Sequence, residues 1–84
     1  MFQEYINAAL KSAKYEILEG DGSIYGEIPP CRGVYAKAAD FEECRNELNS
    51  ILEEWILIRL NRNLDIPIID SINLNLPELA DATY

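Results

Sequence analysis

One long helical pattern in the second half of the sequence restricts the possible folds more than any other feature. Asp40 precedes its first apolar residue and Glu43 follows three positions later, a spacing typical of a capped helix N-terminus. Glu42 adds negative charge where the helix dipole favours it. Apolar residues then recur every three or four positions, which predicts a helix that spans roughly 30 Å. These residues are Phe41, Cys44, Leu48, Ile51, Leu52, Trp55 and Ile58.

The end of this helix is apolar on nearly all sides. The pattern continues to about Arg59 or Arg62, basic residues that suit a helix C-terminus. Just before them, Trp55, Ile56 and Leu57 follow one another, so more than one face of the helix must be covered. Two interpretations stay open: burial within the chain itself, or a surface for self-association or for a partner, with these three residues as candidates.

Three strand patterns joined by short connections precede the helix. Residues 14–19 and 23–28 flank a Gly-Asp-Gly turn, which is a β-hairpin signal. Residues 34–38 follow a break rich in proline and glycine. Three strands with such short connections predict an antiparallel meander.

The two ends of the chain carry weaker patterns. Residues 1–13 have the apolar spacing of a short amphipathic helix, which we expect to dock on its own domain. After the long helix, Asn63 suits a helix end, and the pattern of residues 65–70 predicts a short fourth strand whose proline is typical of a sheet edge. The pattern of residues 71–84 predicts a strand-like or frayed tail. The expected plan is an α+β domain with its core at residues 14–70.

Composition fits one small folded domain with a strongly acidic charge. The chain has 84 residues, so we expect a single domain over residues 1–84, with an oligomer interface, most simply that of a dimer, to supplement its core. Fifteen Asp and Glu against seven Lys and Arg give a formal charge of −8, which argues against direct nucleic-acid binding. A basic protein is the better partner, although the charge could equally serve solubility.

The sequence offers no arrangement typical of an enzyme. Cys31 and Cys44 occur without any histidine, so neither a zinc site nor a Cys-His nucleophile pair can form, and we expect two free thiols. Adjacent glutamates diverge by about 100° on a helix and do not converge on a metal ion. We therefore expect no catalytic, metal or cofactor site. Because the sequence shows neither a signal peptide nor an apolar stretch of membrane-spanning length, we expect a cytoplasmic protein without membrane contact.

From Tyr15 to Asp70 the sequence resembles the HicB family of antitoxins. The resemblance rests on the order and spacing of several short pieces and not on any one of them. The pieces are Tyr15-Glu16-Ile17-Leu18-Glu19 before an Asp-Gly turn, Gly26-Glu27-Ile28-Pro29, Gly33-Val34, Asp40-Phe41-Glu42-Glu43-Cys44 where the family usually has Thr-x-Glu-Glu-Ala, and Ile66-Pro67-Ile68. The resemblance implies a partial RNase-H-like fold of three antiparallel strands, one helix and a fourth strand, without the catalytic carboxylates of RNase H enzymes.

The resemblance also implies a function, which is to bind and neutralise a HicA toxin, a small basic ribonuclease that cleaves messenger RNA. Longer family members add a C-terminal DNA-binding domain, for which we expect too few residues here. The alternative function is a stand-alone structural homo-oligomer that has no toxin partner.

Five residues are candidates for contact with such a toxin, whose RNA-binding surface they would cover. Tyr25, Glu27 and Tyr35 share one face of the second and third strands because side chains alternate across a strand, and Glu42 and Glu43 begin the long helix. Aromatic residues with polar tips suit such contacts. Tyr25 and Tyr35 could instead simply pair across neighbouring strands.

Overall fold

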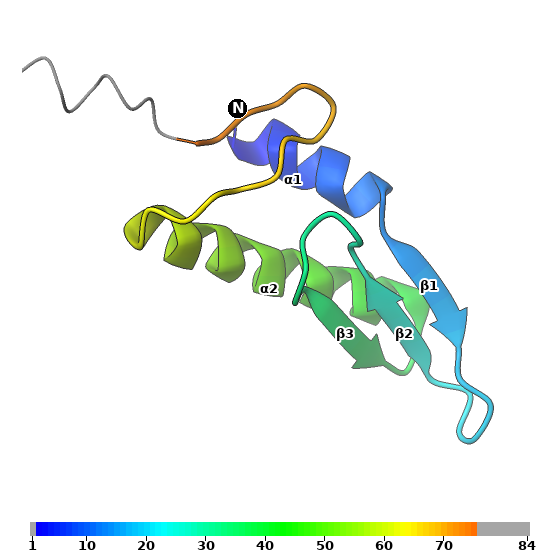
Figure 1. Cartoon of the computed structure of the whole chain (residues 1–84). Coiled ribbons are helices and arrows are strands. Elements are labelled where there is room, and N and C mark those ends of the chain that lie inside the picture. Colours follow the sequence, from blue (N-terminus) through cyan, green and yellow to red (C-terminus); the bar gives the residue numbers. More distant parts are fainter. Residues whose placement is uncertain (1, 76–84) are drawn as a thin grey trace, which may run out of the picture.

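The computed structural model describes residues 2–75 and confirms the α+β class. A short helix, a three-stranded antiparallel sheet of order β1-β2-β3 and a long helix follow one another along the chain (Figure 1). The elements are α1 (Phe2–Lys11), β1 (Lys14–Ile17), β2 (Ile24–Glu27), β3 (Tyr35–Ala38) and α2 (Phe41–Asn61). The predicted helix, meander and long helix all form, with strands one or two residues shorter than their sequence patterns.

The cap predicted for the start of α2 forms, but the hydrogen bond to the Glu43 side chain comes from a different residue than expected. The Asp40 backbone is extended and its Oδ1 accepts a hydrogen bond from the Glu43 backbone N–H at 2.8 Å. The Glu43 carboxylate reaches back one residue further than expected and accepts from the Ala39 N–H at 3.1 Å. Two of the backbone donors at this helix start are thus satisfied, which fixes where the chain leaves the sheet.

The C-terminus of α2 closes in a Schellman motif. Asn63 has a positive φ of 56°, as expected for the residue after a helix end. The Leu64 N–H donates to the Arg59 carbonyl at 2.8 Å, and the Asn63 N–H donates to the Leu60 carbonyl at 3.2 Å. These bonds satisfy two of the last carbonyls and turn the chain back toward α1.

Helix α2 covers one face of the sheet, called the inner face here, and leaves the other, the outer face, open. It packs on β2 and β3, and α1 packs on α2. The inner-face residues of β2 and β3 are small or aliphatic and buried, namely Ile24, Gly26, Ala36 and Ala38. Within residues 2–75 no element lies over the outer face.

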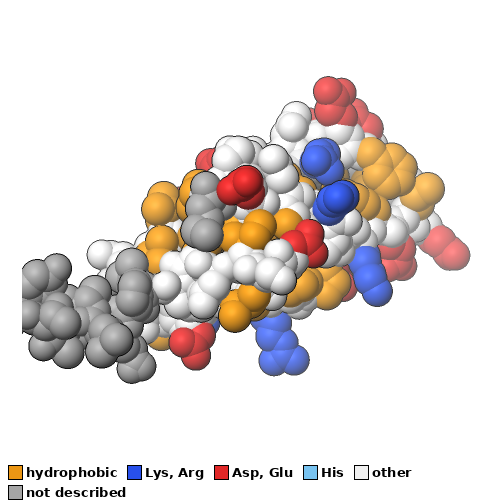
Figure 2. All heavy atoms as spheres, turned by 90° about the horizontal axis from the view of Figure 1, so that it is seen from above, with side chains coloured by type: hydrophobic (Ala, Val, Ile, Leu, Met, Phe, Trp, Pro, Cys, Tyr) orange, Lys and Arg blue, Asp and Glu red, His pale blue; other side chains and the backbone are white. Residues whose placement is uncertain are grey.

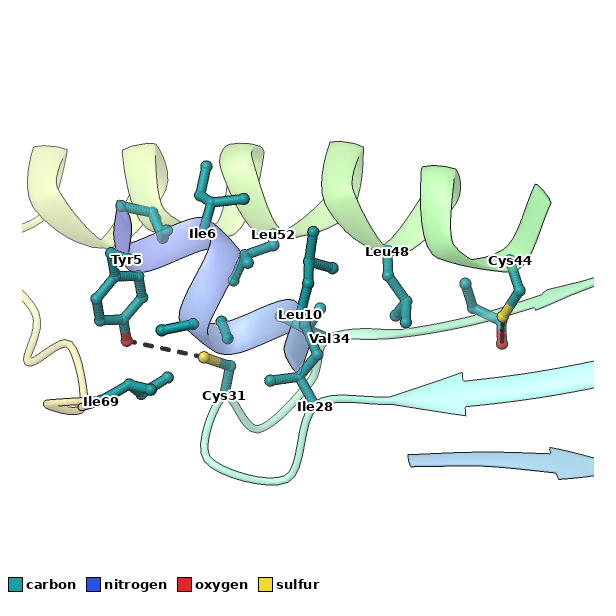
Figure 3. Close-up of a cluster of buried hydrophobic side chains, with 14 of the residues drawn as sticks. Tyr5, Ile6, Leu10, Ile28, Cys31, Val34, Cys44, Leu48, Leu52 and Ile69 are labelled. Carbon is teal, nitrogen blue, oxygen red and sulfur yellow. Dashed lines mark hydrogen bonds between the residues drawn. The ribbon is translucent and has the colours of Figure 1, made fainter. Parts of the chain in front are cut away.

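The core joins α1, α2 and the loop between β2 and β3 (Figure 3). Ile6 of α1 and the Leu48 and Leu52 side chains of α2 are all fully buried in it. The loop at residues 28–34 adds the buried side chains of Ile28, Cys31 and Val34. Tyr5 is fully buried and donates a hydrogen bond from its hydroxyl to the Pro67 carbonyl at 2.5 Å. The amphipathic helix therefore docks on its own domain, as expected from its spacing.

The predicted fourth strand does not join the sheet. Ile69 pairs with Ile72 in an isolated bridge across a tight turn, and residues 65–68 form no ladder with β1. The physical reason is that local partners occupy the backbone: the Asn75 side-chain amide donates to the Ile66 carbonyl at 2.9 Å and accepts from the Ile66 N–H at 2.8 Å. Pro67 has no N–H to offer a neighbouring strand. Of the predicted tail, residues 71–75 form only this bridge, and residues 76–84 lie outside the described part of the chain.

Candidate interaction surface

The outer face of the sheet holds three of the five candidate contact residues side by side. The rings of Tyr25 and Tyr35 lie 6.3 Å apart between centroids at an interplanar angle of 32°. The Tyr25 hydroxyl donates to the Glu27 carboxylate at 3.1 Å, and Glu27 stands directly opposite Tyr35 in the ladder. We call these three residues the outer-face cluster. The two tyrosine rings therefore pair across the strands and also form part of an open surface. Although the rings contact each other, Tyr35 remains 59% exposed.

The hydrogen bond and the charges around Tyr25 keep its hydroxyl protonated. Partial desolvation raises the pKa of Tyr25, and the hydrogen bond to the Glu27 carboxylate raises it further. The hydroxyl thus remains a neutral donor at physiological pH. Because the ring packs on Tyr35 and the hydroxyl is held by Glu27, the cluster is ordered before any partner arrives.

The charges of the outer face nearly balance one another, because Lys14 and Lys37 offset most of the charge of its acids. Lys14 is paired in the ladder with Glu27, and Lys37 lies opposite Tyr25 with its ammonium 3.7 Å from the Asp21 carboxylate. Asp21 belongs to the hairpin turn, where hydrogen bonds from the Ser23 hydroxyl and N–H lower the pKa of its carboxyl to about 2. The acidity of the chain is therefore not concentrated on this face.

The remaining two candidates lie on the other side of the sheet. Glu42 and Glu43 are exposed in the first turn of α2, the helix that covers the inner face. Glu47 and Glu54 are exposed further along the same helix. The structure thus separates an aromatic cluster on the outer face from an acidic surface on α2, which the sequence pattern had grouped together.

The three candidates for self-association differ in their surroundings. Ile56 is fully buried in the core, so it does not belong to a surface, because its position on α2 continues the buried row of Leu48 and Leu52. Trp55 is partly buried, with the Arg59 guanidinium 4.8 Å above its ring. Leu57 is 58% exposed. Figure 2 shows hydrophobic side chains reaching the surface among scattered acidic and basic ones.

An open cavity of about 390 Å³ beside Trp55 was not expected from the sequence. Arg32 and Arg59 line it together with Pro67, and the Arg59 Nε donates to the Asp65 carbonyl at 2.6 Å. Arg32 and Arg59 lie far apart in the sequence, so no local pattern could have brought them together. The guanidinium of Arg59 is already engaged on both the ring and the carbonyl.

Two further observations concern the described residues. Cys31 and Cys44 are free thiols, as predicted, and both are buried. Among residues 2–75 no three His, Cys, Asp or Glu side chains gather as they would to hold a metal ion. Neither helix of this part of the chain is long and apolar enough to cross a membrane.

Comparison with known proteins identifies a matching family and a similar solved structure. The model of the UPF0150-like family matches residues 4–67. The crystal structure of TTHA0281 from Thermus thermophilus is similar with a TM-score of 0.81 and 32% sequence identity, covering 92% of this chain and 95% of that one. No match is found among curated proteins.

Proposed function

The chain belongs to the UPF0150-like family, and from that premise we propose that it is an antitoxin-type binding protein. It neutralises a small, basic, HicA-like ribonuclease by covering the toxin's RNA-binding surface, and it contributes no catalysis of its own. Its place of action is the cytoplasm, where the messenger RNA that such a toxin cleaves is found. The observation that carries the proposal is the outer-face cluster: two tyrosines and a glutamate, ordered and open to a partner.

The outer-face cluster has the chemistry of a binding hot spot. Tyr25 and Tyr35 offer large, rigid rings with polar tips, the residue type that most often dominates interface energies. Glu27 places a carboxylate beside them, which suits a cationic side chain of a basic partner. Because the three side chains already hold one another, little conformational entropy is lost on binding.

The acidic surface of α2 acts at a distance in this proposal. Glu42 and Glu47 lie on the helix that covers the inner face and do not touch a protein bound to the outer face. Their field still extends about 8 Å at physiological ionic strength and attracts a basic protein during encounter. We therefore assign affinity to the outer-face cluster and the speed of association to α2.

The test measures association and dissociation rates separately, with the small basic protein encoded next to this chain's gene as the partner. Tyr35→Ala is expected to speed dissociation and weaken binding by about 2 kcal/mol, or roughly 30-fold in Kd. Glu42→Lys/Glu47→Lys is expected to slow association and to reduce its salt dependence, with little change in dissociation. Glu43 is left unchanged because it caps the helix.

The matched control is Leu57→Ser, which removes an equally exposed apolar side chain from a different surface. It should bind the toxin as the wild type does. Absence of a complex with the wild-type chain would contradict the antitoxin role, and a complex unaffected by Tyr35→Ala would remove the outer-face cluster from it.

A second candidate, a structural homo-oligomer without a toxin, is favoured by apolar surface on α2. Leu57 and Ile58 are 58% and 48% exposed, and two neighbouring aliphatic side chains on one helix make a patch that self-association would cover. This candidate predicts self-association that Leu57→Ser weakens, together with no complex in the experiment above.

A further inference from the structure

Strand β1 is an open edge of the sheet, and its hydrogen bonds to β2 determine which of its backbone groups point outward. It pairs with β2 on one side, and residues 2–75 provide no strand on its other side. The Leu18 N–H donates to the Ser23 carbonyl at 2.8 Å, so the backbone groups of Leu18, Glu16 and Lys14 point toward β2. By alternation, the N–H and C=O groups of Tyr15 and Ile17 point outward from the sheet.

Most side chains of β1 are also left uncovered. Helix α2 packs mainly on β2 and β3, and three of the four β1 residues are exposed. Ile17 lies on the inner face and is 62% exposed. Phe41, whose ring packs against Tyr15 with centroids 5.6 Å apart, is 53% exposed. Ile17 and Phe41 thus leave apolar surface beside an open edge, which pairing with another strand would help to cover.

We propose that two copies of this chain pair through β1 in antiparallel orientation and form one continuous six-stranded sheet. The proposal goes beyond the toxin-binding function and does not rest on it. We choose a second copy of the chain as the partner of this edge because the edge is complementary to itself. Its outward backbone groups can pair with those of a second copy, and its charges can pair with opposite ones.

The backbone phase allows only a few two-fold registers. Outward-pointing residues must face outward-pointing residues, so within β1 the two-fold axis passes through Lys14, Tyr15, Glu16 or Ile17. An axis at Lys14 or at Glu16 places two like charges opposite each other, which is destabilising. An axis at Ile17 places Glu16 opposite Leu18 and leaves both Lys14 side chains without an acidic neighbour in the second copy.

An axis at Tyr15 satisfies both the backbone and the side chains. Lys14 of each copy faces Glu16 of the other on the outer face, giving two ion pairs from opposite charges. The two Tyr15 residues exchange backbone hydrogen bonds, and each Ile17 N–H donates to the Ala13 carbonyl of the other copy. On the inner face, Ile17 is covered by Ala13 of the second copy, and both helices α2 lie on the same side of the shared sheet.

The decisive experiment uses two variants that repel themselves and attract each other. Lys14→Glu gives an edge with two glutamates, and Glu16→Lys gives an edge with two lysines. Each is expected to dimerise at least about tenfold more weakly than the wild type, because two attractive pairs become repulsive. Mixed together, the two variants regain opposite charges at both pairs, and native mass spectrometry should detect a heterodimer as stable as the wild-type dimer.

Several outcomes would overturn the proposal. They are a wild type that light scattering finds monomeric at a concentration of about 100 µM, undiminished dimers of either single variant, or no preference for the heterodimer on mixing. Lys14 also faces Glu27 within its own sheet, so thermal unfolding of each variant is measured to establish that the monomer folds.

Two further variants separate this edge from the other apolar surface. Ile17→Pro removes an outward N–H without removing a bond to β2 and is expected to abolish the dimer. Leu57→Ser is expected to leave the dimer intact, and its conversion to a monomer would move the interface to α2.

Discussion

At the scale of single residues, Gly26 is the position whose identity the packing fixes most tightly. A Cβ atom built there would lie 2.9 Å from the Cys44 Sγ and 2.9 Å from two ring carbons of Tyr15, which stands directly opposite in the ladder. The absence of a side chain thus lets the Tyr15 ring lie across the strand beneath α2. Glycine is needed here for space and not for an unusual backbone, since its φ is not positive.

We expect Gly26→Ala to destabilise the fold by about 1–3 kcal/mol, the usual cost of an additional carbon in a well-packed site. Urea denaturation of the variant and the wild type measures this difference. Gly20→Ala is the matched control, because a Cβ at Gly20 meets no atom within 4 Å and its backbone is not left-handed. Equal losses at both positions would contradict the packing argument.

At the scale of elements, α2 depends on its cap as well as on its buried row of side chains. Asp40→Ala removes the acceptor of the Glu43 N–H bond and is expected to cost about 1 kcal/mol. Amide hydrogen exchange should accelerate at Glu43, in the first turn, and much less in the last turn of the helix. Thermal or urea unfolding gives the total loss.

Glu42→Gln is the control for this helix start. It removes one negative charge near the helix dipole but no capping bond, so its cost should stay at about 0.5 kcal/mol or less. A loss as large as that of Asp40→Ala would indicate that charge and not the side-chain hydrogen bond stabilises this end.

At the scale of the whole molecule, both thiols are enclosed by segments from distant parts of the chain. Cys31 lies 3.9 Å from the Tyr5 hydroxyl, and Tyr5 in turn binds Pro67, so α1, the β2–β3 loop and the segment after α2 close over one site. Cys44 lies between α2 and the sheet, with its thiol 3.7 Å from the Ala36 carbonyl. Burial raises the pKa of both thiols.

We therefore expect both cysteines to resist a thiol-specific reagent at mildly alkaline pH until the protein opens. Raised pKa values leave little thiolate, and neither sulfur is accessible in the folded chain. Both should react at the same slow rate, set by opening of the structure, and at once in concentrated guanidinium chloride. Rapid labelling of Cys31 alone would show that the closure over Tyr5 opens independently of the rest.

Features that depend on nearby residues were predictable from the sequence alone. The cap at Asp40, the extent of α2, the hairpin and the turn at Asn63 each follow from a short-range hydrogen bond or a side-chain period that the sequence displays directly. Tyr25, Glu27 and Tyr35 were placed together correctly because alternation along two paired strands suffices to predict it.

Only the tertiary structure decided which surfaces remain open. Ile66, Pro67 and Ile68 have the composition of a strand, but contacts with Asn75 and Tyr5 hold this segment away from the sheet. Glu42 and Glu43 lie apart from the tyrosines because α2 crosses to the inner face. Exposure of Ile17 likewise depends on where α2 lies and on the lack of a fourth strand within residues 2–75. Whether a side chain is buried depends on which neighbours folding places around it. An apolar pattern indicates only that a side chain favours burial and does not say which element covers it.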